Sequence, residues 1–395
     1  MTTNWRVYFS SGARLSWARV DDGNGQVTVL DSVMAPDNVQ YGVADAAGRY
    51  LYLATSDGGP GLPPGVRNQL SCWAIDADSG ALTPHGAPQA LPSRPLHLSM
   101  AADGGHLLLA FHQPAAFDVY RIAADGSVGS AVPQDAAIDP GVFPHQIRAT
   151  PGDGTVLVCA RGNEAQPSAS APAQPGALLT FRYVDGQLSP LARHTPPDGL
   201  GPRGLAWHPN GRWAYVAFEL GNQLGQYALV DGAIRGAPEY LTSTLADPDS
   251  CGPGPAQRAG AIQLHPNGRT LYVTNRADQT TLVDGTVRFA GGENNIAVFR
   301  LDETSGQPGL LQHIATEGIE PRTMAISPDG RVLIVGNQTA IMVDANDRKG
   351  PYEISPCITI FHIQEDGKLI LANRFDCPVT APLIWMSIIP GRHNA

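Results

Sequence analysis

This sequence has little that would place the chain in a membrane, on nucleic acid or in a secretory route. It has no apolar stretch approaching the ~18 residues of a membrane span. The first residues, Met1 to Val7, lack the basic segment and following hydrophobic segment of a signal peptide. The formal charge is −10 and there is no run of Lys or Arg. We therefore expect no membrane and no nucleic acid among its partners.

Cysteine is scarce as well. The five cysteines are odd in number, lie far apart and form no Cys-x-x-Cys pair: Cys72, Cys159, Cys251, Cys357 and Cys377. A reduced protein tolerates such residues as small core side chains, so we expect a cytoplasmic location. A P-loop, a Gly-x-Ser-x-Gly elbow and a His-Glu-x-x-His motif are also missing. We expect no cofactor and no metal ligand set, while a divalent metal that assists the chemistry stays open.

Helix signals are nearly absent, and turn residues are abundant instead. Gly (44) and Pro (34) together make about a fifth of the chain, which suits many turns and few helices. The hydrophobic fraction of 43% is ample for a packed core. Composition thus favours a chain of short strands joined by tight turns.

One unit recurs along the chain, and the segment from Pro202 to Glu219 shows it well. It reads as an apolar strand, a Pro-Asn-Gly turn, a second apolar strand and then a polar residue. The seven turn glycines are Gly48, Gly104, Gly154, Gly211, Gly268, Gly330 and Gly391. Their spacing of 50 to 62 residues is typical of propeller blades.

The last copy of the unit is divided between the two ends of the chain. Residues 382–392 supply its first half, and Trp5 to Ser11 supply its second half. A repeat that is completed by joining the termini implies a ring without an open edge. We therefore predict an all-β, seven-bladed β-propeller, a single domain over residues 1–395. Its seventh blade is shared between residues 5–11 and about 355–392.

The repeat also predicts which side chains meet at one end of the ring. The residue after the Pro opens each inner strand, and the residue eight after the Gly closes the second strand, so both lie roughly 25 Å from the turn at ~3.3 Å per residue. The opening residues are Gln40, Leu96, His145, Arg203, Gly260, Arg322 and Leu383. The closing residues are Ser56, His112, Arg161, Glu219, Arg276, Gln338 and either Ser10 or Ser11. The third unit is shifted by one residue relative to the others, so the positions of His145 and Arg161 are predicted only to within one residue.

These residue types suggest a chemistry at that end of the ring. Several guanidiniums that converge on a pocket suit a carboxylate or phosphate ligand, and they would also stabilise an oxyanion that forms on an ester carbonyl. His145 and Glu219 can move or orient protons, and neighbouring arginines should keep Glu219 ionised. A pair of Arg203 and Glu219 that only ties neighbouring blades together is an equal alternative.

Several segments carry a family resemblance, clearest between about residues 140 and 340. They are Pro144-His145-Gln-Ile, Pro202-Arg203-Gly-Leu-Ala-Trp-His-Pro-Asn-Gly, Thr274-Asn275-Arg276 and Pro321-Arg322-Thr-Met-Ala-Ile-Ser-Pro-Asp-Gly. Together they resemble the seven-bladed propeller lactonases, which include the 6-phosphogluconolactonase-like proteins and the carboxy-cis,cis-muconate lactonizing enzymes.

The resemblance implies a catalytic group of His145, Arg203, Glu219 and Arg276, which the register had already brought together. We add Arg322, Gln338, Arg161, His112 and Asn275 as candidate substrate-binding residues. Gly204 and Leu96 depart from the polar residues expected at their positions, which leaves the substrate open.

The resulting hypothesis is a monomeric lactonase that hydrolyses an anionic sugar-acid or carboxylated lactone. Two alternatives stay open. A muconate-type cycloisomerase would use the same arginines to bind a dicarboxylate and close it to a lactone. A non-catalytic propeller would bind a small anion or a protein, since a fold alone does not determine function.

Overall fold

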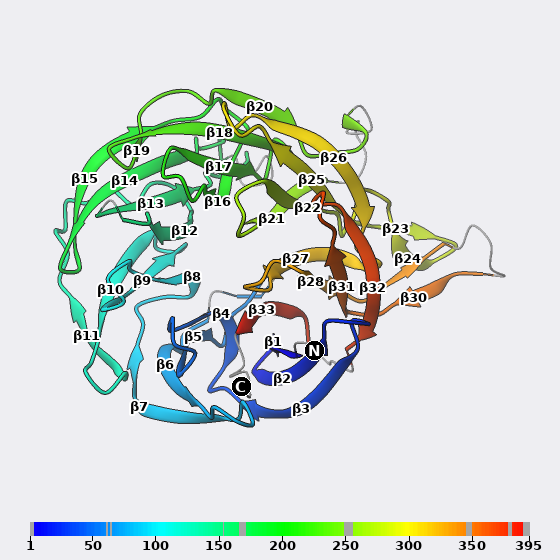
Figure 1. Cartoon of the computed structure of the whole chain (residues 1–395), viewed down its shortest axis with the longest axis horizontal. Coiled ribbons are helices and arrows are strands. Elements are labelled where there is room, and N and C mark those ends of the chain that lie inside the picture. Colours follow the sequence, from blue (N-terminus) through cyan, green and yellow to red (C-terminus); the bar gives the residue numbers. More distant parts are fainter. Residues whose placement is uncertain are drawn as a thin grey trace.

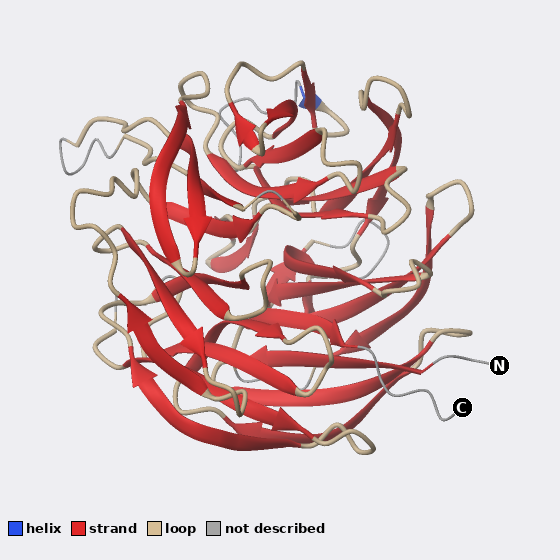
Figure 2. Cartoon of the chain, turned by 60° about the vertical axis from the view of Figure 1, so that its left-hand side comes forward, coloured by secondary structure: helices blue, strands red, loops and turns tan. Residues whose placement is uncertain are grey.

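The computed structural model describes residues 4–60, 62–63, 65–152, 154–165, 171–248, 256–344, 350–377 and 381–389. The regular secondary structure of these residues is almost entirely strand (Figure 2), and no helix among them is long and apolar enough to cross a membrane. Seven antiparallel sheets stand around a central axis (Figure 1), which confirms the predicted seven-bladed propeller. Two short hairpins project from the ring: β23 (Thr280–Val283) with β24 (Thr286–Phe289), and β29 (Ile341–Val343) with β30 (Tyr352–Ile354).

The first three blades follow one another along the chain, each from its inner to its outer strand. Blade 1 has β4 (Asn38–Ala44), β5 (Tyr50–Ser56), β6 (Asn68–Ile75) and β7 (Leu82–Ala90). Blade 2 has β8 (Pro95–Met100), β9 (His106–Phe111), β10 (Ala116–Ile122) and β11 (Val128–Val132). Blade 3 has β12 (Pro144–Ala149), β13 (Thr155–Ala160), β14 (Ala177–Val184) and β15 (Gln187–His194).

The next three blades continue the same order. Blade 4 has β16 (Pro202–Trp207), β17 (Trp213–Phe218) and β18 (Gln223–Val230), with β19 (Ala233–Ile234) and β20 (Tyr240–Ser243) both paired to β18. Blade 5 has β21 (Arg258–Leu264), β22 (Thr270–Arg276), β25 (Asn295–Leu301) and β26 (Pro308–Ala315). Blade 6 has β27 (Ile319–Ile326), β28 (Val332–Thr339), β31 (Cys357–Ile363) and β32 (Leu369–Asp376).

Blade 7 closes the ring with strands from both ends of the chain, as predicted. Its inner strand β33 (Leu383–Ile389) pairs with β1 (Asn4–Ser11), and β2 (Arg14–Asp21) and β3 (Val27–Met34) complete it. The predicted boundaries of blade 7, residues 5–11 and about 355–392, were wrong. Residues 357–376 complete blade 6, because β28 pairs with β31 across the inserted β29–β30 hairpin. The predicted turn at Gly391 lies outside the described residues.

The apolar strands pack blade against blade. Each of the seven neighbouring pairs of blades shares a cluster of buried side chains. Between blades 4 and 5, for example, Trp213 and Tyr215 pack in one cluster with Leu271 and Phe299. Both faces of a middle strand such as β17 are therefore buried, which explains its uninterrupted apolar sequence.

Buried tyrosines tie blades together at a second level. A tyrosine on the second strand of one blade donates its hydroxyl hydrogen to the carbonyl of a turn glycine in the next blade. The pairs are Tyr8 with Gly80, Tyr52 with Gly126, Tyr215 with Gly306 and Tyr272 with Gly367, at 2.8–2.9 Å. Each of these glycines has a positive φ, which an L side chain rarely adopts.

Candidate active site

β-Bulges at the start of the inner strands aim the predicted side chains. In blade 4, Pro202 pairs with Phe218 and Gly204 pairs with Ala217, so Arg203 is the extra residue of a bulge. The same register shift falls on His145 in β12 and on Arg322 in β27. A bulged residue leaves the alternation of the strand and is turned to a new direction.

The bulge recurs in the remaining blades. It falls on Gln40 in blade 1, on Leu96 in blade 2 and on Gly260 with Ala261 in blade 5. In blade 7 it falls between Phe9 and Ser11, opposite Ile384 and Trp385, while Leu383 pairs with Ser11. In blade 7 the bulge comes one residue later than in the other blades. Leu383 is therefore a paired residue and does not correspond to the bulged residues there.

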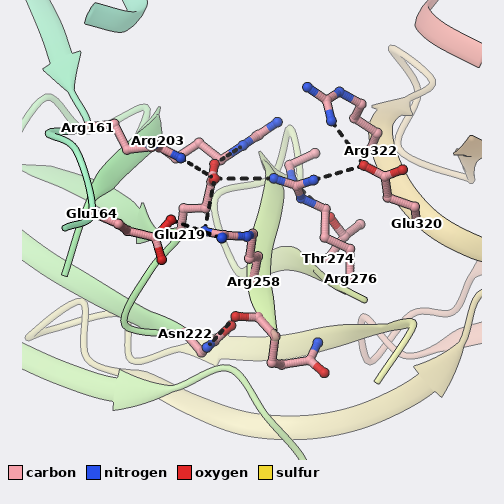
Figure 3. A network of polar contacts seen from close by, with 12 residues as sticks. Arg161, Glu164, Arg203, Glu219, Asn222, Arg258, Thr274, Arg276, Glu320 and Arg322 are labelled. Atoms are coloured by element: carbon pink, nitrogen blue, oxygen red, sulfur yellow. Dashed lines mark hydrogen bonds and ion pairs between the residues drawn. The ribbon is translucent and has the colours of Figure 1, made fainter. Parts of the chain in front are cut away.

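Glu219 lies at the centre of the site, directly after β17. Its side chain is 5% exposed and is surrounded by four guanidiniums (Figure 3). Arg161 Nη1 lies 2.9 Å and Arg276 Nη2 lies 3.4 Å from its Oε1. Arg203 Nε lies 3.0 Å from its Oε2, and Arg258 Nη1 lies 3.8 Å from its Oε1. The guanidiniums come from blades 3, 4 and 5, so the carboxylate joins three blades.

A second carboxylate, Glu320, continues this network toward blade 6. Its Oε1 lies 3.0 Å from both Arg276 Nη1 and Arg322 Nη1, and its Oε2 accepts a hydrogen bond from Thr339. Glu320 has a φ of 58°, which is strained for a residue with a side chain, and its backbone N–H donates to Asn294 Oδ1. Arg276 therefore bridges two buried carboxylates, as Figure 3 shows.

The charges of these groups depend on one another. Burial alone would raise the pKa of Glu219, but Arg276, Arg203, His145 and Arg161 hold it well below the usual range. Burial, together with Arg276 and Arg322, lowers the pKa of Arg203 to about 9, although Glu219 opposes this shift. Burial also acts to lower the pKa of Arg276, but Glu219 and Glu320 outweigh it and raise that pKa. The site at neutral pH is thus a set of paired ions with an excess of guanidiniums.

His145 adds a neutral imidazole to this site. Burial, and then Arg203, holds the pKa of His145 well below its ordinary value, although Glu219 opposes the shift. Its Nδ1 is buried and has no hydrogen-bond partner among the described residues. Phe143, which has a φ of 57°, stacks its ring parallel to the imidazole of His145 at 6.1 Å between centroids. His145 is therefore packed in place as a neutral imidazole, and it lines the cavity described below.

Phe143 also organises the neighbouring cation and a second imidazole. The Arg161 guanidinium carbon lies 4.2 Å from the centre of the Phe143 ring, and the His112 ring lies 3.7 Å from it. Burial, followed by Arg161 and Arg94, lowers the pKa of His112 to about 4. His112 is thus neutral as well and lies at the edge of the site.

A cavity of about 480 Å³ runs along the axis beside these residues. Every inner strand contributes to its lining, and His145, Arg203 and Arg322 are among the lining residues. The other three predicted ion-pair residues, Arg161, Glu219 and Arg276, are not part of the lining and are connected to it through Arg203 and, by way of Glu320, through Arg322. The volume is in the range of small-molecule sites.

The structure brings together seven of the nine predicted site residues. Two lie differently. Asn275 is fully buried and donates to Thr244 O and Asn295 Oδ1, so its side chain does not face the cavity. Strand alternation explains this, because Asn275 and Arg276 point to opposite faces of β22. Gln338, adjacent to Thr339, is buried, and its Oε1 has no hydrogen-bond partner among the described residues.

The sequence prediction missed Arg258 and Glu320. Glu320 directly precedes the Pro321-Arg322 motif, at the position that Gly201 occupies before Pro202-Arg203. An acidic residue at a position where another repeat has Gly could have indicated it. Arg258 lies at the start of β21, two residues before Gly260, which the repeat selected in that blade. In the described part of the chain, no group of three or more His, Cys, Asp or Glu side chains is arranged to hold a metal ion.

Fold and site together define a seven-bladed propeller with an arginine- and carboxylate-rich centre at one end of its channel. The chain belongs to the family described as Lactonase, 7-bladed beta-propeller, which it matches over residues 5–350. It is 30% identical over 369 residues to the 6-phosphogluconolactonase of Pectobacterium carotovorum, covering 92% of each chain. It is 27% identical over 276 residues to that of Bacillus subtilis, covering 68% of this chain and 70% of the relative.

Solved structures share the fold. The periplasmic gluconolactonase PpgL of Pseudomonas aeruginosa superposes with a TM-score of 0.71 and 22% identity, covering 98% of this chain and 100% of that one. A protein from Lactobacillus plantarum gives a TM-score of 0.73 and 20% identity, with coverage of 98% and 100%. At these identities the likeness shows the fold alone.

Proposed function

We propose that this protein hydrolyses a lactone that carries a negative charge, such as a phosphorylated or carboxylated sugar lactone. The observation that carries the proposal is the group of four guanidiniums around Glu219, beside a cavity of about 480 Å³. Family membership and relatives named 6-phosphogluconolactonase support the reaction class.

The guanidiniums stabilise the charge that develops during attack on the lactone carbonyl. Arg203 lines the cavity, and its Nε lies 3.0 Å from Glu219 Oε2 in an ion pair without hydrogen-bond geometry, so the carboxylate keeps the guanidinium at the cavity wall. Such a preorganised donor stabilises an oxyanion more than it stabilises the neutral carbonyl. Arg276, which is held by Glu219 and Glu320, supplies positive charge directly behind it.

His145 is the base that the site supports best. Glu219 is held ionised by guanidiniums and has a strongly depressed pKa, so it orients the arginines rather than accepting a proton. His145 is neutral and lines the cavity. An anionic substrate would raise its proton affinity by the attraction between unlike charges.

Hydrolysis then proceeds in two steps. A water oxygen bonds to the carbonyl carbon while His145 accepts a proton from that water, and the carbonyl oxygen becomes an oxyanion beside Arg203. The oxyanion then re-forms the carbonyl, and the ring C–O bond breaks. The ring oxygen leaves with the proton that His145 returns, and the product is an open hydroxy acid.

A lactone panel with mass detection of one added water tests this proposal. Arg203→Lys is expected to lower kcat by roughly 100-fold, since the loss of one oxyanion donor has about that effect. His145→Gln should lower kcat as well. Arg269→Ala serves as the control, because Arg269 is exposed and pairs only with the exposed Glu303 among the described residues. Unchanged turnover in both Arg203→Lys and His145→Gln would rule the proposal out.

The alternatives give different results in the same assay. A cycloisomerase would incorporate deuterium at carbon without net addition of water. A binding propeller would show a thermal shift with acids and no turnover.

A further inference from the structure

The channel carries more positive charge than the ion pairs at its end account for. Four arginines line its cavity: Arg94, Arg148, Arg203 and Arg322. The one acidic lining residue is Asp45, at the far turn between β4 and β5, where it accepts the backbone N–H groups of Arg49 and Tyr50. Arg203 and Arg322 have carboxylate partners, whereas Arg94 and Arg148 have none among the described residues.

Arg94 lies at the entrance, just before β8. Its Nε donates to Gln40 Oε1 at 2.9 Å, and its Nη1 donates to the Gly59 carbonyl at 3.1 Å. Burial and the repulsion of Arg322, which comes from blade 6, lower the pKa of Arg94 to about 10. Its neutral contacts orient the guanidinium without neutralising it.

Arg148 lies deeper, in the middle of β12. It follows His145 by three residues, which is roughly 10 Å along a strand at ~3.3 Å per residue. Its Nη1 donates to the Leu205 carbonyl at 3.1 Å, and this bond accounts for one of its five N–H donors. Tyr41 and His97 are close enough for the charge of Arg148 to lower the pKa of each. These neighbours are neutral, so the charge of Arg148 is not balanced within the channel.

We propose that the channel is the compartment for the anionic group of the ligand, with Arg148 as the residue that selects for that group and Arg94 as the cation at the entrance. This inference rests on the proposed function, since it places the lactone carbonyl beside Arg203 and the charged group inside the channel. A half-buried cation without a carboxylate partner carries a desolvation cost, and a bound carboxylate or phosphate would balance its charge. The cavity, rather than the Glu219 ion pairs, then determines which lactones bind.

Substitutions at Arg148 separate its charge from its bond between blades. Arg148→Gln keeps a side-chain N–H donor but loses the charge, whereas Arg148→Lys keeps the charge. Arg300→Gln is the matched control, because Arg300 Nη2 makes the same kind of bond between blades, to the Asp366 carbonyl at 2.9 Å, and does not line the cavity.

We would measure kcat and KM for 6-phosphogluconolactone and for unphosphorylated gluconolactone. Arg148→Gln is expected to raise KM for the phosphorylated lactone by about 10-fold or more, the effect of roughly one lost ionic contact, and to leave the neutral lactone within about two-fold. Arg148→Lys and Arg300→Gln should stay near wild type. Equal changes for both lactones, or no change for the phosphorylated one, would overturn the inference.

A binding measurement separates this inference from the proposed function. If the wild-type protein hydrolyses neither lactone, the proposed function fails, and calorimetry with inorganic phosphate decides the inference instead. The channel site is supported if phosphate binds to the wild type and if this binding is lost in both Arg148→Gln and Arg94→Gln. An affinity that these substitutions leave unchanged, or no binding by the wild type, refutes it.

Discussion

At the scale of single residues, the site depends on carboxylates that hold guanidiniums in place. Glu219 and Glu320 are each about 5% exposed at the side chain and are paired on several sides. Taking such charges out of water is costly, and paired geometry repays that cost only in part. The arrangement therefore points to a function in orienting arginines. A buried apolar cluster would have joined the blades at lower cost.

The neutral state of His145 makes a prediction about pH. Its pKa is held well below the ordinary value of ~6.5 by burial and by Arg203. The active, neutral imidazole therefore persists as pH falls through 6.5, and kcat/KM should stay within about two-fold between pH 8 and pH 6. A fall in kcat/KM with a midpoint near 6.5 that is absent in His145→Gln would contradict this.

The same shift affects stability in a defined direction. In the unfolded chain His145 would take up a proton below pH ~6.5, whereas in the folded chain it does not. The unfolded state then binds more protons, so the free energy of unfolding falls as pH drops below about 6.5. Urea denaturation at pH 7.5 and 5.5 measures this fall, which should be smaller in His145→Gln.

At the scale of elements, the bulge is what converts a regular strand repeat into a site. Without it, Arg203 would follow the alternation of β16 and face a neighbouring blade. The sequence positions of these residues were predictable from the repeat, because the turn glycine and the Pro lie at a constant spacing. Their convergence depends on the register shift, which the sequence does not display.

The tyrosine ties between blades give a prediction with an internal control. Tyr215→Phe and Tyr272→Phe each remove a buried hydrogen bond to a glycine carbonyl and should lower the free energy of unfolding by about 1 kcal/mol. Tyr227 is equally buried, but its hydroxyl has no partner among the described residues. Tyr227→Phe should therefore be neutral or stabilising. Equal losses for all three variants, in chemical denaturation, would contradict the role of these bonds.

At the scale of the whole molecule, the ring is closed by one strand from the C-terminal end and three from the N-terminal end. β33 supplies the inner strand of blade 7, and its side chains enter the apolar clusters on both sides of that blade. Closure leaves no blade with an open edge toward a gap in the ring.

Trp385 tests this closure. It is 3% exposed and packs in the cluster between blades 7 and 1. Trp385→Ala should lower the free energy of unfolding by about 3–5 kcal/mol, the usual effect of removing a large aromatic from a core. Leu282→Ala is the control, since Leu282 is 72% exposed and should change stability by less than about 0.5 kcal/mol. A loss at Trp385 no larger than this control, in thermal or urea unfolding, would show that blade 7 does not hold the ring.

The sequence by itself determined the number of blades, the closure through the termini and the end of the ring at which charged residues gather. These features are local, because turn chemistry and strand periodicity repeat at a constant spacing along the chain. Only the tertiary structure decided that Arg258 and Glu320 belong to the network, that Asn275 does not face the cavity and that Arg148 stands unbalanced in the channel. Those facts depend on which residues of different blades meet, and on the direction a bulge gives a side chain. The residue spacing along one strand predicts neither the contacts between blades nor the direction of a bulged side chain.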